Sequence, residues 1–348
     1  MKKLCLGLLL IIFSIKGFAQ MPKLKLDETV MFLPGFAVEQ PDGSFRVGVN
    51  AWVFEQDSKR FTISALLTWL NVDYNELTPE QKALLEERTR YFRTDSERGK
   101  RLRVRLADKV FTLQRTNAHG RVHGRLNVGR EWVKWANGSN GLGSITWTLE
   151  APWHPLHGQK GSAWVIPAEG VSIVSDVDDT IKISEVLNKK TLVRNTFMKP
   201  FQAVPGMAEW YQEMARDEQH AFFHYLTASP VQLYPALSAF MKDANFPPGI
   251  LHLRESTSWR TLYGGRKVTV AHKKDTIVRL LTNFPRRKFI LIGDSGERDP
   301  EIYADIARTY PERILGVHIR NVTDEDRNAP RYQQTFDGID PKIWHIRD

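Results

Sequence analysis

The feature that most limits the possible folds is the order of expected strands and helices after about residue 165. Short apolar runs that fit strands alternate with stretches that fit helices, and this continues to about residue 319. Strands alternating with helices are typical of a parallel sheet covered by helices. The sequence therefore predicts an α/β region with a doubly wound parallel sheet, which binds ligands at the carboxyl ends of its strands.

The expected elements of this region have the following bounds. Strands are predicted at 171–174, 221–226, near 251, at 288–292 and at 314–319, and helices at 207–216, 231–244, 274–283 and 300–310. Residues 151–170 are rich in Pro, Gly and His, which is typical of a linker.

The part of the chain before this linker has the residue pattern of a β-rich region. Residues 45–54 and 101–106 alternate between apolar and polar side chains, and residues 144–149 resemble a further strand. This period of two, interrupted by turn residues, predicts an antiparallel sheet or sandwich. A helix is expected from Thr78, which is followed by proline and glutamate, to about Phe92. The predicted organisation is a signal peptide at 1–19, a β-rich domain at 20–160 and an α/β domain at 161–348.

The first residues have the pattern of a secretory signal peptide. Lys2 and Lys3 precede an apolar run that ends at Ile15, and cleavage is expected after Ala19. The alternative, an uncleaved anchor, is less favoured because the run is shorter than the ~20 residues that span a bilayer. Cys5 is the chain's only cysteine. A secreted or periplasmic mature chain would therefore contain no disulfide and no cysteine-bound metal.

The formal net charge of +9 is unevenly distributed along the chain. Residues 21–165 contain 21 basic and 16 acidic side chains, whereas residues 166–348 contain 25 and 24. Arg101, Arg103 and Arg105 share one face of an expected strand, which predicts a peripheral contact with an anionic membrane. A solvated outer face is an equally good interpretation. The sequence contains no recognisable nucleic-acid-binding motif, so no nucleic-acid partner is expected.

Three carboxylates follow the first strand of the α/β region. The strand at 171–174 runs into Asp176, Asp178 and Asp179. Three acids at one strand end repel each other unless a cation or hydrogen-bond donors compensate them. This favours a metal-dependent carboxylate site over a purely structural polar turn.

Polar side chains also follow the next strands, in a fixed order. Thr227 ends the second strand as a candidate phosphate ligand, whereas Ser229, before a proline, fits a helix cap. Lys273 and Lys274 are expected to open the helix before the strand at 288–292, and Lys273 is preferred because Ile277, four residues later, should face the core. Asp294 and Asp299 follow the carboxyl end of that strand.

These four signals together resemble the haloacid dehalogenase superfamily of aspartyl phosphotransferases. The motif sequences are similar to those of the actin-patch-associated phosphatidate phosphatase family. They read Ser-Asp-Val-Asp-Asp-Thr-Ile-Lys, Tyr-Leu-Thr-Ala-Ser-Pro and Gly-Asp-Ser-Gly-Glu-Arg-Asp-Pro-Glu-Ile-Tyr. The resemblance extends over about residues 170–322. It is weaker for the β-rich region, which looks like the domain that accompanies this family.

The resemblance implies a role for each residue of the motifs. Asp176 would be the nucleophile that forms an aspartyl-phosphate, and Asp178 the general acid and base. Lys273 would stabilise the nucleophile and the transferring phosphoryl group. Thr227 would bind a phosphate oxygen. Mg²⁺ would be held by Asp176, the backbone carbonyl of Asp178 and Asp294, with Asp299 orienting a metal-bound water.

The expected function is a secreted, Mg²⁺-dependent phosphatidate phosphatase that releases diacylglycerol and phosphate. The spacing between motifs leaves room only for a short flap at 181–201, and an open site suits a bulky or membrane-presented phosphomonoester. It would equally admit a nucleotide, a nucleic-acid end or a phosphoprotein, so a phosphatase of these substrates is the first alternative. The second alternative is a non-catalytic scaffold that binds anionic lipid, which would be expected to have lost part of the motif set.

Overall fold

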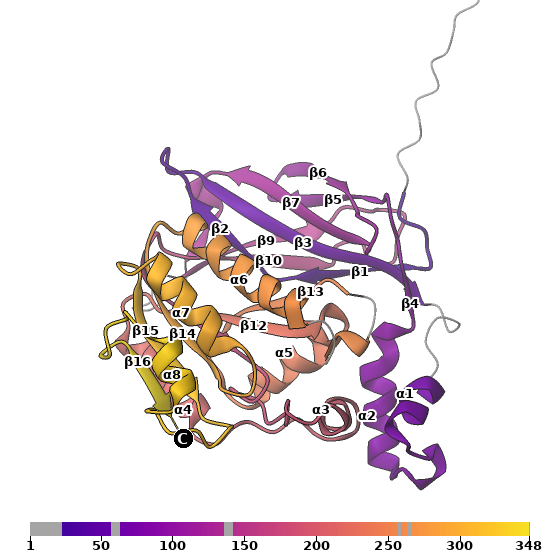
Figure 1. Cartoon of the computed structure of the whole chain (residues 1–348). Helices are drawn as coiled ribbons and strands as arrows, with labels where there is room; N and C mark the ends of the chain where they lie inside the picture. The colour runs from indigo at the N-terminus through magenta and orange to yellow at the C-terminus, as the bar shows by residue number, and fades with distance from the viewer. Residues whose placement is uncertain (1–22, 57–62, 136–141, 257–258, 263–265, 348) are drawn as a thin grey trace, which may run out of the picture.

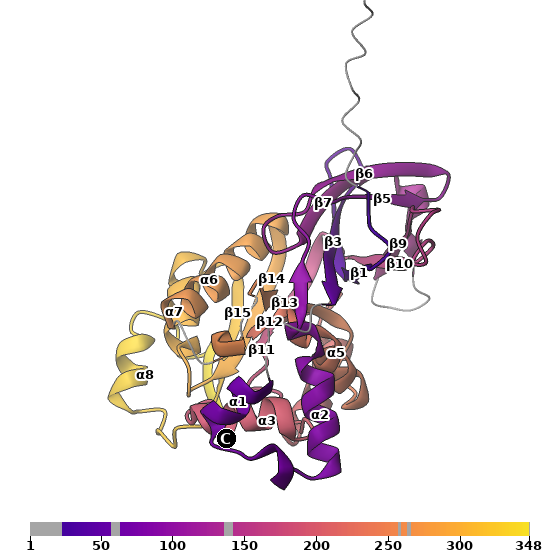
Figure 2. The ribbon, with the colours of Figure 1, turned by 90° about the vertical axis from the view of Figure 1, so that its right-hand side faces the viewer.

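The chain forms two β-sheets that lie one above the other, with most helices around the second (Figures 1 and 2). The computed structural model describes residues 23–56, 63–135, 142–256, 259–262 and 266–347. The predicted signal peptide and Cys5 lie outside the described residues. No helix in the described part of the chain is long and apolar enough to cross a membrane.

The first sheet has ten strands and is antiparallel except where β10 pairs with β2. Its main path runs β1-β3-β2-β10-β9-β5-β6, with β4, β7 and β8 attached at its side. The strands are β1 (Glu28–Leu33), β2 (Gly35–Glu39), β3 (Phe45–Gln56), β4 (Thr94–Ser96), β5 (Arg101–Leu106), β6 (Lys109–Arg115), β7 (Arg121–Val128), β8 (Lys134–Trp135), β9 (Gly143–Leu149) and β10 (Lys160–Val165).

The alternation in β5 has the burial that the sequence predicts. Leu102, Val104 and Leu106 are buried in the core of the first sheet, and the three arginines that alternate with them are exposed. Arg105 donates a hydrogen bond to Glu150 over 2.8 Å. In Figure 1, β5 and β6 lie at the top of the view, whereas the chain's C-terminus, after the last strand of the second sheet, lies at the bottom. The basic face of β5 is therefore at the far end of the molecule from the carboxyl edge of the second sheet.

The second sheet has six parallel strands in the order β13-β12-β11-β14-β15-β16. Its strands are β11 (Glu169–Asp176), β12 (Phe222–Pro230), β13 (Gly249–Arg254), β14 (Arg286–Asp294), β15 (Ile314–Arg320) and β16 (Trp344–Arg347). The helices of this half of the chain are α3 (Lys189–Met198), α4 (Met207–Asp217), α5 (Tyr234–Asp243), α6 (Arg266–Asn283), α7 (Asp299–Thr309) and α8 (Pro330–Thr335).

Both faces of the second sheet are covered. Along β14, Phe289 and Leu291 pack into one apolar cluster and Ile290 and Ile292 into the other, because successive side chains of a strand point to opposite faces. Helices α3, α4 and α5 contribute to the cluster of Ile290 and Ile292, and α6 and α7 to the other. The observed class is therefore α/β, with a parallel sheet between two layers of helices and a β-rich region before it.

Two helices that precede β4 in the chain pack against the second sheet's half of the molecule. They are α1 (Ile63–Leu70) and α2 (Pro79–Thr89), and their buried leucines join the same cluster as α3, α4 and α5. Thr78 caps α2 as the sequence predicts, since its hydroxyl accepts from the Gln81 N–H and the Gln81 side chain accepts from the Thr78 N–H. Helix α1 was not predicted, because its apolar run ISALLTWL is short.

Several predicted bounds are wrong. The expected linker at 151–170 contains β10, and the change from the first sheet to the second falls between Val165 and Glu169. Helix α6 begins at Arg266, so Lys273 lies within it and does not open it. The segment at 181–201, expected as a short flap, contains the ten-residue helix α3, and α1 and α2 pack against it. Strand β16 and helix α8 were not predicted.

Candidate active site

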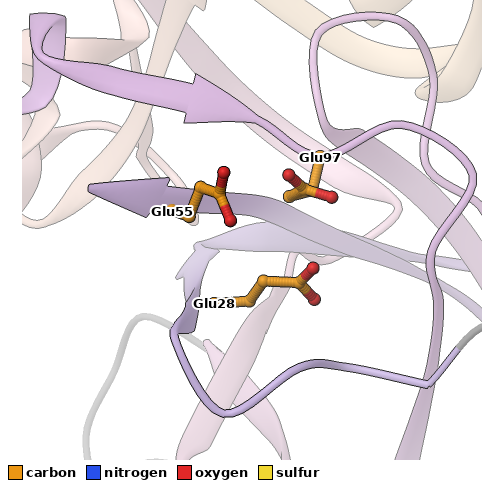
Figure 3. A group of neighbouring side chains, drawn as sticks. All are labelled: Glu28, Glu55 and Glu97. Carbon is orange, nitrogen blue, oxygen red and sulfur yellow. The ribbon is translucent and has the colours of Figure 1, made fainter. Parts of the chain in front are cut away.

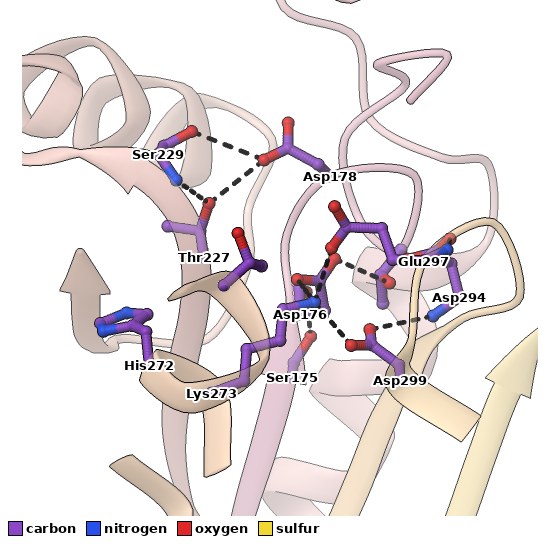
Figure 4. Close-up of polar contacts among 12 residues, drawn as sticks. Ser175, Asp176, Asp178, Thr227, Ser229, His272, Lys273, Asp294, Glu297 and Asp299 are labelled. Carbon is purple, nitrogen blue, oxygen red and sulfur yellow. Dashed lines mark hydrogen bonds and ion pairs between the residues drawn. The ribbon is translucent and has the colours of Figure 1, made fainter. Parts of the chain in front are cut away.

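The predicted site residues meet at the carboxyl ends of three neighbouring strands (Figure 4). Asp176 is the last residue of β11, Thr227 lies near the end of β12 and Asp294 is the last residue of β14. Asp299 begins α7 directly after the β14 loop, and Lys273 reaches the site from α6. The parallel register explains this grouping, because strands that run the same way end at the same edge.

Lys273 is the centre of the charged network. Its ammonium lies 2.7 Å from Asp176 Oδ1, 2.6 Å from Asp299 Oδ1 and 2.9 Å from Glu297 Oε2. The side chain is fully buried, and so is Ile277 one helical turn later. Lys274 instead points to the surface, where its ammonium pairs with Asp305 at 2.5 Å. The structure thus brings Lys273 into the site and leaves Lys274 outside it.

The acidic side chains around Lys273 carry more negative charge than one lysine can balance. Carboxylate oxygens of Asp176, Glu297 and Asp299 all lie within 4.8 Å of one another. Burial, and then the neighbouring carboxylates, raise the pKa of Asp176, Asp294 and Asp299 against the opposing effect of Lys273. Such a set of oxygens is what a hard divalent cation prefers.

Asp294 offers a further oxygen to this cluster. Its Oδ1 accepts from the backbone N–H groups of Gly296 at 2.7 Å and Glu297 at 3.1 Å. Its Oδ2 is buried and has no hydrogen-bond partner among the described residues. A buried carboxylate oxygen without a partner is costly, so this atom fits a cation ligand.

The backbone at Gly293 lets Asp299 approach the end of β14. A Cβ added at this glycine would lie 2.4 Å from Asp299 Oδ2, closer than two non-bonded atoms can pack. The missing side chain of Gly293 is therefore needed for close packing of Asp299, whose Oδ2 accepts from the Asp294 N–H at 3.4 Å.

Glu297 was missed by the sequence interpretation. It was quoted within the motif Gly-Asp-Ser-Gly-Glu-Arg-Asp but was given no role, because only the two flanking aspartates had a counterpart in the resemblance. Its backbone carbonyl accepts from Arg331 of α8 at 2.9 Å, which helps fix the loop. The sequence did contain one indication of a role for Glu297. It is an acid three residues after Asp294, in the loop that folds back on the end of β14.

Asp178 lies apart from the Lys273 network, within a cage of donors. Lys182 Nζ lies 2.7 Å from Oδ1, and the Ser184 hydroxyl donates to the same atom at 2.7 Å. The Thr227 hydroxyl donates to Oδ2 at 3.1 Å. Burial opposes ionisation, but Lys182 and the hydrogen bonds together lower the pKa of Asp178. The sequence interpretation gave Lys182 no role.

Ser229 does not cap a helix, which corrects the prediction. It lies within β12, and neither the 3-10 turn at Val231–Leu233 nor α5 has a side-chain cap. Its N–H donates to Thr227 Oγ1 at 2.9 Å, and its hydroxyl lies 3.5 Å from Asp178 Oδ2 (Figure 4). Ser229 therefore contacts the same carboxylate as Thr227.

The third carboxylate of the first motif has a structural position. Asp179 adopts a positive φ of 55° and its side chain accepts from three backbone N–H groups of the following turn, those of Ser184, Glu185 and Val186. These bonds shape the turn before α3, so Asp179 is not available to the acidic cluster.

A second acidic cluster lies in the first sheet, at Glu28, Glu55 and Glu97 (Figure 3). The Lys100 ammonium bonds to Glu28 and lies 3.3 Å from Glu97, and Lys25 lies 3.7 Å from Glu55. Lysines already balance these acids, so this cluster does not resemble a cation site.

The match to known proteins covers the half of the chain that holds the site. Residues 171–321 match the family described as phosphatidate phosphatase APP1, catalytic domain. An uncharacterized protein of Schizosaccharomyces pombe is 33% identical over 183 residues, which are 51% of this chain and 30% of that protein. Phosphatidate phosphatase APP1 of Saccharomyces cerevisiae is 32% identical over 169 residues, which are 47% of this chain and 28% of that protein.

The chain thus matches less than a third of the length of these two relatives. One solved structure, of a carbohydrate esterase, aligns over 84% of this chain and 88% of its own with 10% identity and a TM-score of 0.23. That score is too low to indicate a shared fold.

Proposed function

We propose that this chain hydrolyses phosphatidate to diacylglycerol and phosphate, because residues 171–321 match the family described as phosphatidate phosphatase APP1, catalytic domain, and the APP1 protein of Saccharomyces cerevisiae is 32% identical over 169 residues. The observation that carries the proposal is the arrangement of Asp176, Lys273 and Asp294 at one edge of the parallel sheet, within the matched segment. The sheet between two helical layers supports a doubly wound, haloacid dehalogenase-like fold for this region.

We propose a magnesium ion at the cluster of buried carboxylates. Asp176, Asp294 and the backbone carbonyl of Asp178 are the proposed ligands, with Asp299 next to them and Glu297 added by the structure. The residues fit a cation because three carboxylates surround one lysine and Asp294 Oδ2 is buried without a partner among the described residues. When bound, the cation would supply positive charge to the oxygens of a phosphoryl group.

The first half of the reaction is assigned to Asp176 and Asp178. An oxygen of Asp176 attacks phosphorus, and the bond from phosphorus to the leaving oxygen breaks with its electron pair on that oxygen. Asp178 gives its proton to the leaving oxygen, so that neutral diacylglycerol departs. Lys273 holds Asp176 Oδ1 at 2.7 Å, which orients the nucleophile and balances charge as the dianion approaches.

The second half reverses the role of Asp178. Its carboxylate takes a proton from water, whose oxygen attacks the phosphorus of the aspartyl-phosphate. The bond from phosphorus to Asp176 breaks, and free phosphate and the starting carboxylate result. The Thr227 hydroxyl, bonded to Asp178 in the structure, lies where it can also contact a phosphoryl oxygen.

A panel of phosphate esters tests the proposal. Phosphate release would be measured on micellar phosphatidate, nucleotides, a 5′-phosphorylated oligonucleotide and a phosphopeptide, with and without Mg²⁺. We expect the highest kcat/KM on phosphatidate and a dependence on the cation. Equal rates on nucleotides and phosphatidate would favour the broader phosphatase, and no release from any ester would favour the anionic-lipid-binding scaffold.

The carboxylate cluster makes a prediction about stability and pH. The raised pKa values of Asp176, Asp294 and Asp299 mean that their contribution to folding is present below about pH 4 and is lost as the pH rises through their folded values. Without divalent cations, the contribution of these three carboxyls to stability should therefore fall as the pH rises above about 4, whereas buried His224 and His252, whose pKa values are lowered by burial, stabilise the fold more as the pH rises. Adding Mg²⁺ should raise Tm more at pH 8 than at pH 5, because binding needs the ionised carboxylates.

The Asp294→Asn variant is the control for this measurement. It keeps the size of the side chain but removes one charge from the cluster, so its Tm should respond less to Mg²⁺ than that of the unchanged chain. An equal Mg²⁺ response in both proteins at pH 8 would contradict the assignment of Asp294 as a ligand.

Two further proposals concern the location of the chain. We propose export by the N-terminal segment. Sequencing the N-terminus of the mature protein tests this, and Gln20 is expected as its first residue.

We also propose that Arg101, Arg103 and Arg105 contact anionic membranes. Flotation with anionic liposomes should be weaker for the triple alanine variant, and equal flotation would remove that role.

A further inference from the structure

Arg254 is a buried cation at the edge of the active site that the mechanism above does not use. It is the last residue of β13 and is about 9% exposed. Strand β13 runs parallel to β12, where Arg254 pairs in register with Pro230, shortly after Thr227. Because parallel strands end at the same edge of a sheet, Arg254 lies at the edge that also holds Thr227 and Asp176.

The neighbours of Arg254 show where its side chain extends. Its Nη1 donates to the Thr269 hydroxyl of α6 at 3.3 Å. Thr269 precedes Lys273 by about one helical turn, so the two side chains lie on the same side of α6. Burial lowers the pKa of the Arg254 guanidinium, and the negative charge of Glu297 opposes that effect. The guanidinium therefore extends toward the Lys273 side of α6 and lies within the field of the acidic cluster.

The residue after Arg254 is directed to the other sheet. Glu255 Oε2 accepts from the Asn117 side chain at 3.2 Å, and Glu255 Oε1 bonds to the His123 ring of β7. Successive side chains of an extended chain point to opposite sides. These contacts of Glu255 therefore direct Arg254 away from the first sheet and toward α6. The β-rich region thus holds the end of β13 and fixes the direction of Arg254.

A guanidinium in this place suits a phosphoryl group. Removing a guanidinium from water is costly unless an anion faces it. Lys273 is already shared by the carboxylates of Asp176, Glu297 and Asp299, so it has little charge to spare for a phosphoryl dianion. The planar fork of an arginine matches two phosphate oxygens at once. Arg254 therefore adds a second cationic side chain at the edge where a dianion must be held.

We propose that Arg254 is a substrate-binding residue that donates to non-bridging oxygens of the phosphoryl group. This inference rests on the proposed function, in which a phosphate ester binds at the carboxyl edge of the second sheet. No bond to Arg254 forms or breaks during the reaction. The contact is with the phosphoryl group, so it is the same whichever alcohol the ester contains.

Binding of inorganic phosphate tests the proposal without turnover. Phosphate is the product released from every candidate ester, and its affinity would be measured by titration calorimetry with Mg²⁺ present. We expect Arg254→Met to weaken phosphate binding by about 10–100-fold, the usual effect of losing hydrogen bonds to a charged group. Arg254→Lys keeps the charge but not the fork, so it should weaken binding by a smaller factor. A similar loss in kcat/KM is expected on each ester that the unchanged chain hydrolyses.

Two matched variants separate phosphate binding from other effects of Arg254. Lys267→Met removes one positive charge from the exposed surface of α6 and should leave the affinity for phosphate unchanged. Thr269→Val removes the hydroxyl that Arg254 contacts and should also change the affinity little. An equal loss in Thr269→Val and Arg254→Met would show that Arg254 acts by holding α6, and would overturn the proposal.

Unchanged phosphate affinity in Arg254→Met would overturn the proposal, as would an unchanged chain that binds no inorganic phosphate. If Arg254→Met yields no soluble protein, Arg254→Lys decides in its place. Weaker binding in that variant supports the contact, and an affinity equal to that of the unchanged chain contradicts it.

The outcomes for Arg254 and for the proposed substrate are distinct. A chain that binds phosphate through Arg254 but does not hydrolyse phosphatidate would refute the lipid substrate and leave the role of Arg254 in place. A chain that hydrolyses phosphatidate, with phosphate affinity and kcat/KM unchanged in Arg254→Met, would refute the role of Arg254 and leave the proposed function in place.

Discussion

Replacing Asp176 by asparagine is expected to lower kcat by about 10⁴-fold or more, because the amide cannot form the aspartyl-phosphate on which both half-reactions depend. The fold should survive the change. The pKa of the buried Asp176 carboxyl is raised by burial and then by the neighbouring acids, so a neutral group of the same shape suits the site. Tm without divalent cations should therefore be unchanged or higher in Asp176→Asn.

Two measurements separate this loss of chemistry from a loss of binding. Acid-quenched reactions should show phosphate attached to the unchanged protein and none attached to the variant. The Asp305→Asn variant is the matched control, since the Asp305 side chain is half exposed and pairs with Lys274, which lies outside the site. Activity retained in Asp176→Asn would show that a different group attacks phosphorus.

Replacing Arg287 by methionine is expected to destabilise the chain by about 3 kcal/mol or more. This guanidinium is fully buried and donates to Ser172 Oγ and to the carbonyls of residues 167, 169, 171 and 220. It thus joins β14 to β11 and to the segment before β12, at the end of the sheet far from the site. Methionine would fill the space but leave these buried acceptors without a donor.

The neighbouring residue provides the control for this prediction. Arg286 is about two-thirds exposed and pairs with exposed Glu169 at 3.2 Å, a kind of contact that contributes between 0 and about 1 kcal/mol. Unfolding in urea should show a large drop in the free energy of unfolding for Arg287→Met and little change for Arg286→Met. Similar values for the two variants would show that the buried network does not stabilise the fold.

The sequence predicted those parts of the fold that depend on local patterns. The strands β11, β12, β14 and β15 were expected within a few residues of their observed bounds, because their continuous apolar runs are long and end at polar motifs. The cap of α2 was also correct, since Thr78, Pro79 and Gln81 act on each other locally. Strand β10 was missed because its residues lie in a segment rich in Pro, Gly and His, and its pairing with β2 and β9 is long-range.

The same distinction holds at the site. Asp176, Asp294 and Asp299 were predicted from the sequence because they lie at or just after strand ends. The strands of a parallel sheet end at the same edge, so these residues are expected to lie together. Glu297 and Lys182 were missed because an acid in a loop and a lysine after a motif have no local pattern that marks them as buried. Their positions follow from how the loop after β14 and the turn before α3 fold back over the strand ends.

The packing of α2 has a consequence for the order in which the chain folds. Arg88 of α2 donates to the carbonyls of Thr196 and Lys199 at the end of α3, more than a hundred residues later. During synthesis α1 and α2 emerge long before α3, β12 and α5 exist, so their apolar faces stay exposed until the second half is made. Helices α1 and α2 therefore reach their final packing only after the second half is made, whereas the first sheet has an apolar core of its own.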